Sequence, residues 1–141
     1  MSKVHQGVTT EVSGNCGYNP FPILPERTDL LRDTSSSIFV DAMDWTWTDL
    51  NGYRDAVAQQ GVGIKFAPLV GQSAIRGTAV GFEDRPASPD GVKSMQRLTA
   101  EVMDQGAFGL STGLTLPPSA YGDTQEIIAS AETMAAYPGR F

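Results

Sequence analysis

Short apolar runs alternate along this chain with longer segments in which apolar residues recur every three or four positions. Three of the short runs, residues 8–13, 64–70 and 107–112, predict β-strands because each is β-branched or apolar and is followed at once by glycine. Residues 38–40 are a further strand candidate. Pro68 inside the second run favours an edge or a strand end, since proline cannot donate a ladder hydrogen bond.

The longer segments predict three helices. The first runs from an N-cap at Thr48 to Gln60 and stops at a glycine. The second opens at Ser88 with a cap, a proline and an acidic residue in the favoured order, and continues to Gly106. The third begins at a capping box of Asp123 and Glu126 and ends at a Pro-Gly pair, residues 138–139.

Residues 71–87 and 113–122 are predicted to be loops. The alternation of strands and helices predicts an α/β fold with a parallel sheet that helices cover. Three strands are too few for a closed barrel, which typically takes about 250 residues. Since the chain begins on a strand and ends where a further strand is due, we expect a segment of a larger unit.

The composition narrows the classes of partner. With 141 residues, of which 40% are hydrophobic, the chain can form one domain with a core. It has 16 acidic and 10 basic residues, and no run of Lys and Arg, so nucleic acid and membranes are not expected as partners. The first residues lack the apolar segment of a signal peptide, and the single cysteine fits a reducing compartment, so we expect a cytoplasmic protein.

The single cysteine is the most informative candidate for chemistry. Cys16 follows the first predicted strand and has Gly14 and Gly17 close by, which allow a steep turn there. Ligands and catalytic groups collect at the carboxyl ends of strands in α/β folds. A thiolate at this edge can bind zinc or act as a nucleophile. The alternative is a small buried hydrophobic residue, because free cysteines are often buried.

Five segments, taken together in chain order, resemble a known family. They are residues 6–12 (QGVTTEV), 14–17 (GNCG), 67–71 (APLVG), 83–87 (EDRPA) and 109–114 (GLSTGL). Over nearly the whole chain this pattern resembles the N-acyl-D-amino-acid deacylases, or D-aminoacylases, of the amidohydrolase superfamily. The GNCG and GLSTGL segments carry most of the specificity of the resemblance.

The resemblance implies a partial metal-binding (β/α)8 TIM barrel. Residues 1–141 would be one segment of a single barrel domain, about three βα units with the second, third and fourth barrel strands. It implies a zinc-dependent hydrolase that cleaves N-acyl-D-amino acids to a carboxylate and a free D-amino acid. Only the metal-binding cysteine of the family carries over, onto Cys16, and no catalytic residue lies in this segment. The isolated chain is therefore expected to be inactive.

The same resemblance gives candidates for the substrate pocket. Gln72, Ser111 and Thr112 follow or end predicted strands, so they would lie near the mouth of the barrel. Gln72 stands where the family often has histidine, and a solvated loop amide is the alternative for it. His5, the only histidine, precedes the first strand and is expected roughly 20 Å from Cys16, at about 3.3 Å per strand residue.

The acidic and aromatic residues Asp41, Asp44, Trp45 and Trp47 form a further cluster, for which we expect capping and packing rather than acid–base catalysis. Three other functions stay open. They are cyclic-amide hydrolysis on the same barrel, a non-catalytic α/β interaction module, and a flavodoxin-like binding domain, which the absence of a phosphate loop disfavours. Open sheet edges also lead us to expect self-association.

Overall fold

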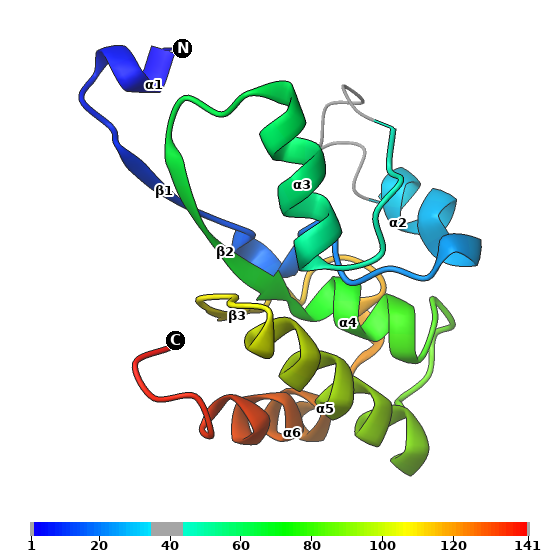
Figure 1. Cartoon of the computed structure of the whole chain (residues 1–141). Helices are drawn as coiled ribbons and strands as arrows, with labels where there is room; N and C mark the ends of the chain where they lie inside the picture. The colour runs from blue at the N-terminus through cyan, green and yellow to red at the C-terminus, as the bar shows by residue number, and fades with distance from the viewer. Residues whose placement is uncertain (1, 35–43, 141) are drawn as a thin grey trace.

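The computed structural model describes residues 2–34 and 44–140 and contains a three-stranded parallel sheet in the order β1-β2-β3 (Figure 1). In chain order the elements are α1 (Ser2–His5), β1 (Thr10–Ser13), η1 (Asn15–Gly17), η2 (Pro25–Arg27), α2 (Thr28–Thr34), α3 (Leu50–Gln60), β2 (Lys65–Gly71), α4 (Gln72–Ala79), α5 (Pro89–Asp104), β3 (Gly109–Ser111), η3 (Ser119–Tyr121) and α6 (Thr124–Met134). The predicted α/β class with a parallel sheet is confirmed.

The central strand β2 pairs with a different neighbour along each half of its length. Its first half pairs with β1, and its second half pairs with β3. Pro68 lies where the pairing changes, opposite Ser13 at the end of the β1 ladder. Its carbonyl accepts a hydrogen bond from the backbone N–H of Phe108 at 2.7 Å. Proline is tolerated in this central strand because it lies where the two ladders meet, at the last pair with β1 and before the first pair with β3.

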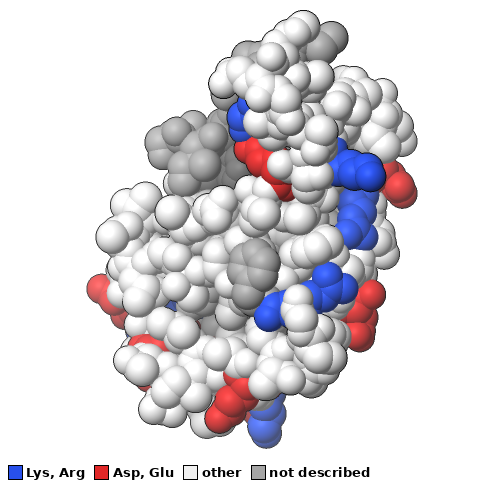
Figure 2. Space-filling view, turned by 90° about the vertical axis from the view of Figure 1, so that its left-hand side faces the viewer, with Lys and Arg blue, Asp and Glu red and all other residues white. Residues whose placement is uncertain are grey.

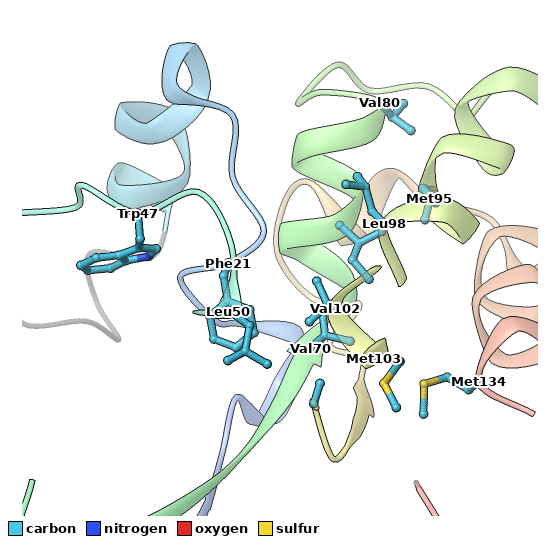
Figure 3. Packing of buried hydrophobic residues seen from close by; sticks show 12 residues of the cluster. Phe21, Trp47, Leu50, Val70, Val80, Met95, Leu98, Val102, Met103 and Met134 are labelled. Carbon is cyan, nitrogen blue, oxygen red and sulfur yellow. The ribbon is translucent and has the colours of Figure 1, made fainter. Parts of the chain in front are cut away.

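Helices cover one face of the sheet. On that face the Phe66 ring lies 6.1 Å from the Tyr53 ring of α3, and Val70 is fully buried. On the opposite face Val12 is 42% exposed. Figure 3 shows the core between sheet and helices, where Met103 of α5 and Met134 of α6 belong to one buried cluster. The buried cluster comprises Phe21, Trp47, Leu50, Val70, Ile75, Val80, Met95, Leu98, Val102, Met103, Ala107 and Met134.

The structure confirms the predicted cap of α5 and shifts the predicted cap of α3 by one residue. Ser88 caps α5 as predicted, since its hydroxyl accepts from the N–H of Gly91 at 3.1 Å. The predicted cap of α3 at Thr48 is wrong by one residue. Asp49 is the cap, because its Oδ1 accepts from the N–H of Gly52 at 2.8 Å while its Oδ2 accepts from the Gln105 side chain. A carboxylate can serve both partners at once.

The predicted loop over residues 71–87 is wrong in its first half, where α4 follows β2 without a connecting segment. Seven of the eight α4 residues, Gln72 to Thr78, are buried. The sequence gives no signal for the start of this helix, because its cap residue Gly71 offers no side chain and no connecting segment separates it from β2. Gly77 within it further weakens the helix signal.

A buried ion pair joins α4 to α6. The Nε of Arg76 lies 2.9 Å from Oε2 of Glu126, and the two side chains are 0% and 1% exposed. The guanidinium also donates to the carbonyls of Arg85 and Tyr121, while Oε1 of Glu126 accepts from the N–H of Ala87 at 2.7 Å. One pair of charges therefore fixes two helices and the two connecting segments beside them.

The predicted capping box of α6 is only half formed. Asp123 accepts from the N–H of Glu126 at 3.0 Å, as expected of the cap residue. The Glu126 side chain turns inward to Arg76 instead of back to the cap. The helix also ends at Met134, ahead of the predicted stop at Pro138. A turn follows, in which the N–H of Tyr137 donates to the carbonyl of Met134 at 2.9 Å.

The strand candidate at 38–40 and the residue Asp41 lie outside the described residues. Within the described ranges, no helix has both the length and the apolar character needed to cross a membrane.

We predict that Glu126→Gln lowers the free energy of unfolding by about 3–5 kcal/mol, because it leaves the Arg76 charge buried without a counter-ion. Glu101→Gln is the matched control, since the ion pair of Glu101 with Arg97 is exposed and typically contributes about 0.3–0.5 kcal/mol. Urea unfolding followed by far-ultraviolet circular dichroism measures both. Equal losses for the two variants would contradict the role given to the buried pair.

Candidate functional site

Cys16 lies in the η1 turn directly after β1, at the carboxyl edge of the sheet. Its thiol is exposed, so the alternative of a small buried hydrophobic residue is wrong. Its backbone φ of 58° is left-handed, and it is the one described residue other than glycine with a positive φ. Such conformations are uncommon outside Gly, Asn and Asp and cluster at functional positions. The turn therefore presents the thiol to solvent at some conformational cost.

This turn packs against the ends of β2 and β3 at backbone distance. A Cβ added to Gly113 would overlap the carbonyl oxygen of Cys16, and one added to Gly71 would overlap the carbonyl oxygen of Gly17. A Cβ on Gly14 would likewise overlap the carbonyl oxygen of Leu69. These approaches are open only to glycine, which explains why glycines surround the candidate site.

Side-chain hydrogen bonds also hold the Cys16 turn against the ends of β2 and β3. The Ser111 hydroxyl donates to the carbonyl of Gly14 and accepts from the N–H of Gly17 at 3.0 Å. Asn19 Oδ1 accepts from the N–H of Gly71 at 2.5 Å. Both side chains join the turn after β1 to a neighbouring strand. The hydroxyl of Ser111, a predicted pocket residue, is thus engaged in holding the Cys16 turn.

Thr112 and Cys16 lie at the same edge of the sheet, as predicted. Both are exposed, and a Cβ on Gly17 would lie 3.2 Å from the Thr112 carbonyl carbon. Thr112 also lines a groove of about 520 Å³ between β3 and α6, with Leu110, Ile127 and Met134 among its walls. Of the three predicted pocket residues, Thr112 is the one exposed beside the thiol.

Gln72 is buried, so the alternative of a solvated loop amide is wrong. It is the first residue of α4 and is 0% exposed. Its Oε1 accepts from the hydroxyl of Ser119, and its Nε2 has no hydrogen-bond partner among the described residues. Contact between Gln72 and a substrate stays a prediction.

Sequence reasoning missed the polar residues beneath the edge. Tyr18 is 5% exposed, and burial raises the pKa of its phenol; the Ser73 hydroxyl opposes this shift and the Cys16 thiol adds to it. Ser73 Oγ lies 2.5 Å from Ser119 Oγ. Tyr18 directly follows the glycine turn, which was the one available sequence signal. Ser73 has none because α4 was not predicted, and Ser119 has none because it lies within the predicted loop 113–122.

His5 lies in α1, at the opposite end of β1 from Cys16, as predicted (Figure 1). A Cys–His dyad is therefore excluded by the strand between them. In the parts of the chain that the structure describes, no three His, Cys, Asp or Glu side chains gather as a metal-binding group. The described residues therefore do not provide Cys16 with two further ligands of these types.

The aromatic residues ahead of α3 pack, as predicted. Trp47 is buried and its indole N–H donates to the carbonyl of Pro20 at 2.6 Å. The Trp45 ring stacks on Trp47 at 5.8 Å between centroids. Asp44 is exposed beside them.

Comparison with known proteins confirms the resemblance to the N-acyl-D-amino-acid deacylases. The chain is 34% identical over 141 residues to a D-aminoacylase of Alcaligenes xylosoxydans xylosoxydans and 32% identical over 143 residues to an N-acyl-D-aspartate deacylase of that organism. The alignments cover 97% and 99% of this chain but 28% and 27% of those proteins. The chain thus spans just over a quarter of the length of these curated relatives. No family model matches it.

Solved structures agree with this result. The N-acyl-D-glutamate deacylase of Bordetella bronchiseptica, complexed with zinc and a phosphonate mimic of the tetrahedral intermediate, superposes with a TM-score of 0.77 at 29% identity. That match covers 95% of this chain and 27% of the deacylase. A D-aminoacylase described as defining a subset of amidohydrolases gives 0.74 at 30% identity, over 97% of this chain and 28% of that one. The three-stranded sheet therefore resembles a part of these enzymes.

We predict that Gly113→Ala destabilises the chain by about 1–3 kcal/mol, because the new methyl group must displace the Cys16 backbone. Gly63→Ala is the matched control: its Cβ would meet only Val4 Cγ2, at 3.5 Å. Thermal unfolding compares the two variants. A control that loses as much stability as Gly113→Ala would contradict the close approach of the two turns.

Proposed function

We propose that this chain is part of a metal-dependent hydrolase that cleaves the amide bond of N-acyl-D-amino acids to a carboxylate and a free D-amino acid. The observation that carries the proposal is the exposed Cys16 thiol, held in a glycine-bounded turn at the carboxyl edge of a parallel sheet. The sequence match to a D-aminoacylase runs through the whole of this region. The proposed substrate is a small N-acyl amino acid.

The proposed metal is zinc, and Cys16 would supply one of its ligands. A thiolate is a preferred zinc ligand and brings a negative charge. Many amidohydrolases instead use a chemically modified lysine as the anionic ligand, and the matching end of β3 carries no lysine. Zinc, when bound, polarises a carbonyl group and lowers the pKa of water. A catalytic zinc site usually has three protein ligands, so at least one ligand must come from outside the described residues.

The proposed setting is a segment, residues 1–141, of a single (β/α)8 barrel domain. The strands lie side by side in chain order, and helices cover one face, as in the wall of such a barrel. On the other face Val12 is exposed, whereas Ala67 and Leu69 are buried. Most of the described surface seen in Figure 2 is formed by uncharged side chains. The outer strands β1 and β3 each have one partner, which supports addition of further strands or self-association.

Within this proposal the chain's own residues have separate tasks. Thr112, exposed beside Cys16, would contact the substrate. Ser111 would hold the thiol-bearing turn through its two hydrogen bonds. Gln72 would support the pocket from behind, because it is fully buried. An exposed single thiol favours a reducing compartment, such as the cytoplasm.

A chimera tests the proposal. This chain replaces the aligned segment of the D-aminoacylase, and zinc content and turnover of N-acetyl-D-methionine are measured. We predict that the chimera binds zinc and that Cys16→Ser lowers turnover by about two orders of magnitude or more, because the anionic donor is lost. His5→Ala is the control, since His5 lies at the far end of β1. A folded chimera whose zinc content and activity survive Cys16→Ser would overturn the proposal.

We further predict that the isolated chain with added zinc does not hydrolyse N-acetyl-D-methionine, because one thiol does not make a three-ligand site. The assay compares the chain with its Cys16→Ser variant. Turnover that disappears in the variant would show that the chain forms a complete site alone, and would contradict the need for an outside ligand.

A further inference from the structure

Strand β3 leaves one of its two edges without a neighbouring strand. It pairs with β2 on one side, and no other described strand lies on its far side. The N–H of Phe108 donates to the Pro68 carbonyl of β2. Since the backbone groups of a strand point alternately to its two sides, those of Gly109 and Ser111 point away from β2. Among the described residues neither makes a backbone hydrogen bond outside the sheet, so the far edge offers two donors and two acceptors.

A groove with mainly apolar walls lies beside this edge, between β3 and α6. Its volume is about 520 Å³, and Leu110 of β3 and Ile127 and Ala131 of α6 are among its walls. Close to it along the chain, Phe108 and Ile128 are each 41% exposed. A strand edge bordered by apolar surface is a site at which a further strand adds.

Two charges of opposite sign belong to the same surface. Arg140 lines the groove and lies over the Phe108 ring at 4.9 Å. Glu132 is exposed on α6, directly after Ala131 of the groove wall. Within the described ranges neither Arg140 nor Glu132 forms an ion pair. A surface with one such cation and one such anion can complement a second copy of itself, because a twofold axis turns each residue toward the other's counterpart.

We propose that β3 and the groove beside it form a twofold interface between two copies of this chain, in which the β3 strands pair antiparallel about Leu110. In this register Gly109 lies opposite Ser111 of the second copy, so the outward groups of both exchange hydrogen bonds. The two Leu110 residues meet as a pair without hydrogen bonds between them, and their side chains contact each other on the face that carries both α6 helices.

Self-pairing of β3 is favoured over a contact between β3 and the β1 strand of another copy. A β1–β3 contact is head to tail and leaves a free edge at each end, so it continues into larger assemblies unless it closes into a ring. Pairing of β3 with itself closes at two copies, and antiparallel pairs are slightly more stable than parallel ones. In the proposed barrel a further strand would take this edge, so a second copy is the occupant that this chain itself supplies.

Sedimentation velocity of the full chain tests the interface without metal or substrate, so its outcome is independent of the proposed hydrolase activity. We expect a monomer–dimer equilibrium. Ala131→Glu is expected to raise the dissociation constant roughly tenfold or more, because the dimer would bury an unpaired carboxylate. Ala58→Glu is the matched control, since Ala58 is also an exposed alanine near the end of a helix, α3, and does not line the groove. A chain that stays monomeric, or equal dissociation constants for the two variants, would overturn the proposal.

Disulfide trapping tests the register in a Cys16→Ser background, which has no other cysteine. The Cα atoms of an antiparallel pair without hydrogen bonds lie about 4.5 Å apart, a distance that a disulfide spans. We therefore expect Leu110→Cys to give a covalent dimer on oxidation with diamide. Thr112→Cys is the control, because the two copies of this position would lie roughly 13 Å apart, at about 3.4 Å per residue.

Circular dichroism checks that both cysteine variants are folded. A folded Leu110→Cys variant that gives no covalent dimer would overturn the twofold register. The same conclusion would follow if Thr112→Cys formed the dimer as fast as Leu110→Cys.

Discussion

At the carboxyl edge of the sheet, the turn after β1 meets the ends of β2 and β3 with backbone against backbone. Glycines at 14, 71 and 113 permit this contact, and the side chains of Ser111 and Asn19 hold it with hydrogen bonds across the strands. The contact forces Cys16 into a left-handed conformation and leaves its thiol in solvent. A donor held this way has little freedom to reorient, which is what a metal ligand requires.

The buried Arg76–Glu126 pair performs the corresponding task behind the sheet. Since α4 follows β2 without a loop, any movement of α4 would move Gly71 and Gln72 at the edge. The pair connects α4 to α6 and to the segments around residues 85 and 121. An isolated buried charge is costly, and each partner here is compensated by the other and by backbone groups. The charged pair thus makes the position of α4 depend on α6.

Local sequence signals predicted the elements that have them. The helix that starts at Ser88 has its cap, its proline and an apolar stripe, and the short strands end at glycine, so both were found. Helix α4 was missed because it is short, has no side-chain cap and follows β2 without a connecting segment, so nothing in the local sequence marks its start. The spacing of Glu126 from Asp123 indicates a capping box, but the side chain of Glu126 pairs with Arg76, which is 50 positions away. Contacts of that range have no local sequence pattern.

In the candidate site too, local sequence signals predicted some features and long-range contacts determine the rest. The position of Cys16 at a strand end followed from its flanking glycines, and the resemblance gave it a role. The layer beneath it, with Tyr18, Ser73, Gln72 and Ser119, comes from three segments that only the fold brings together. Burying so many polar groups beside one thiol is unfavourable unless each finds a partner. Their retention at this edge is understandable if the edge must stay both rigid and polar, as the proposed zinc site would require.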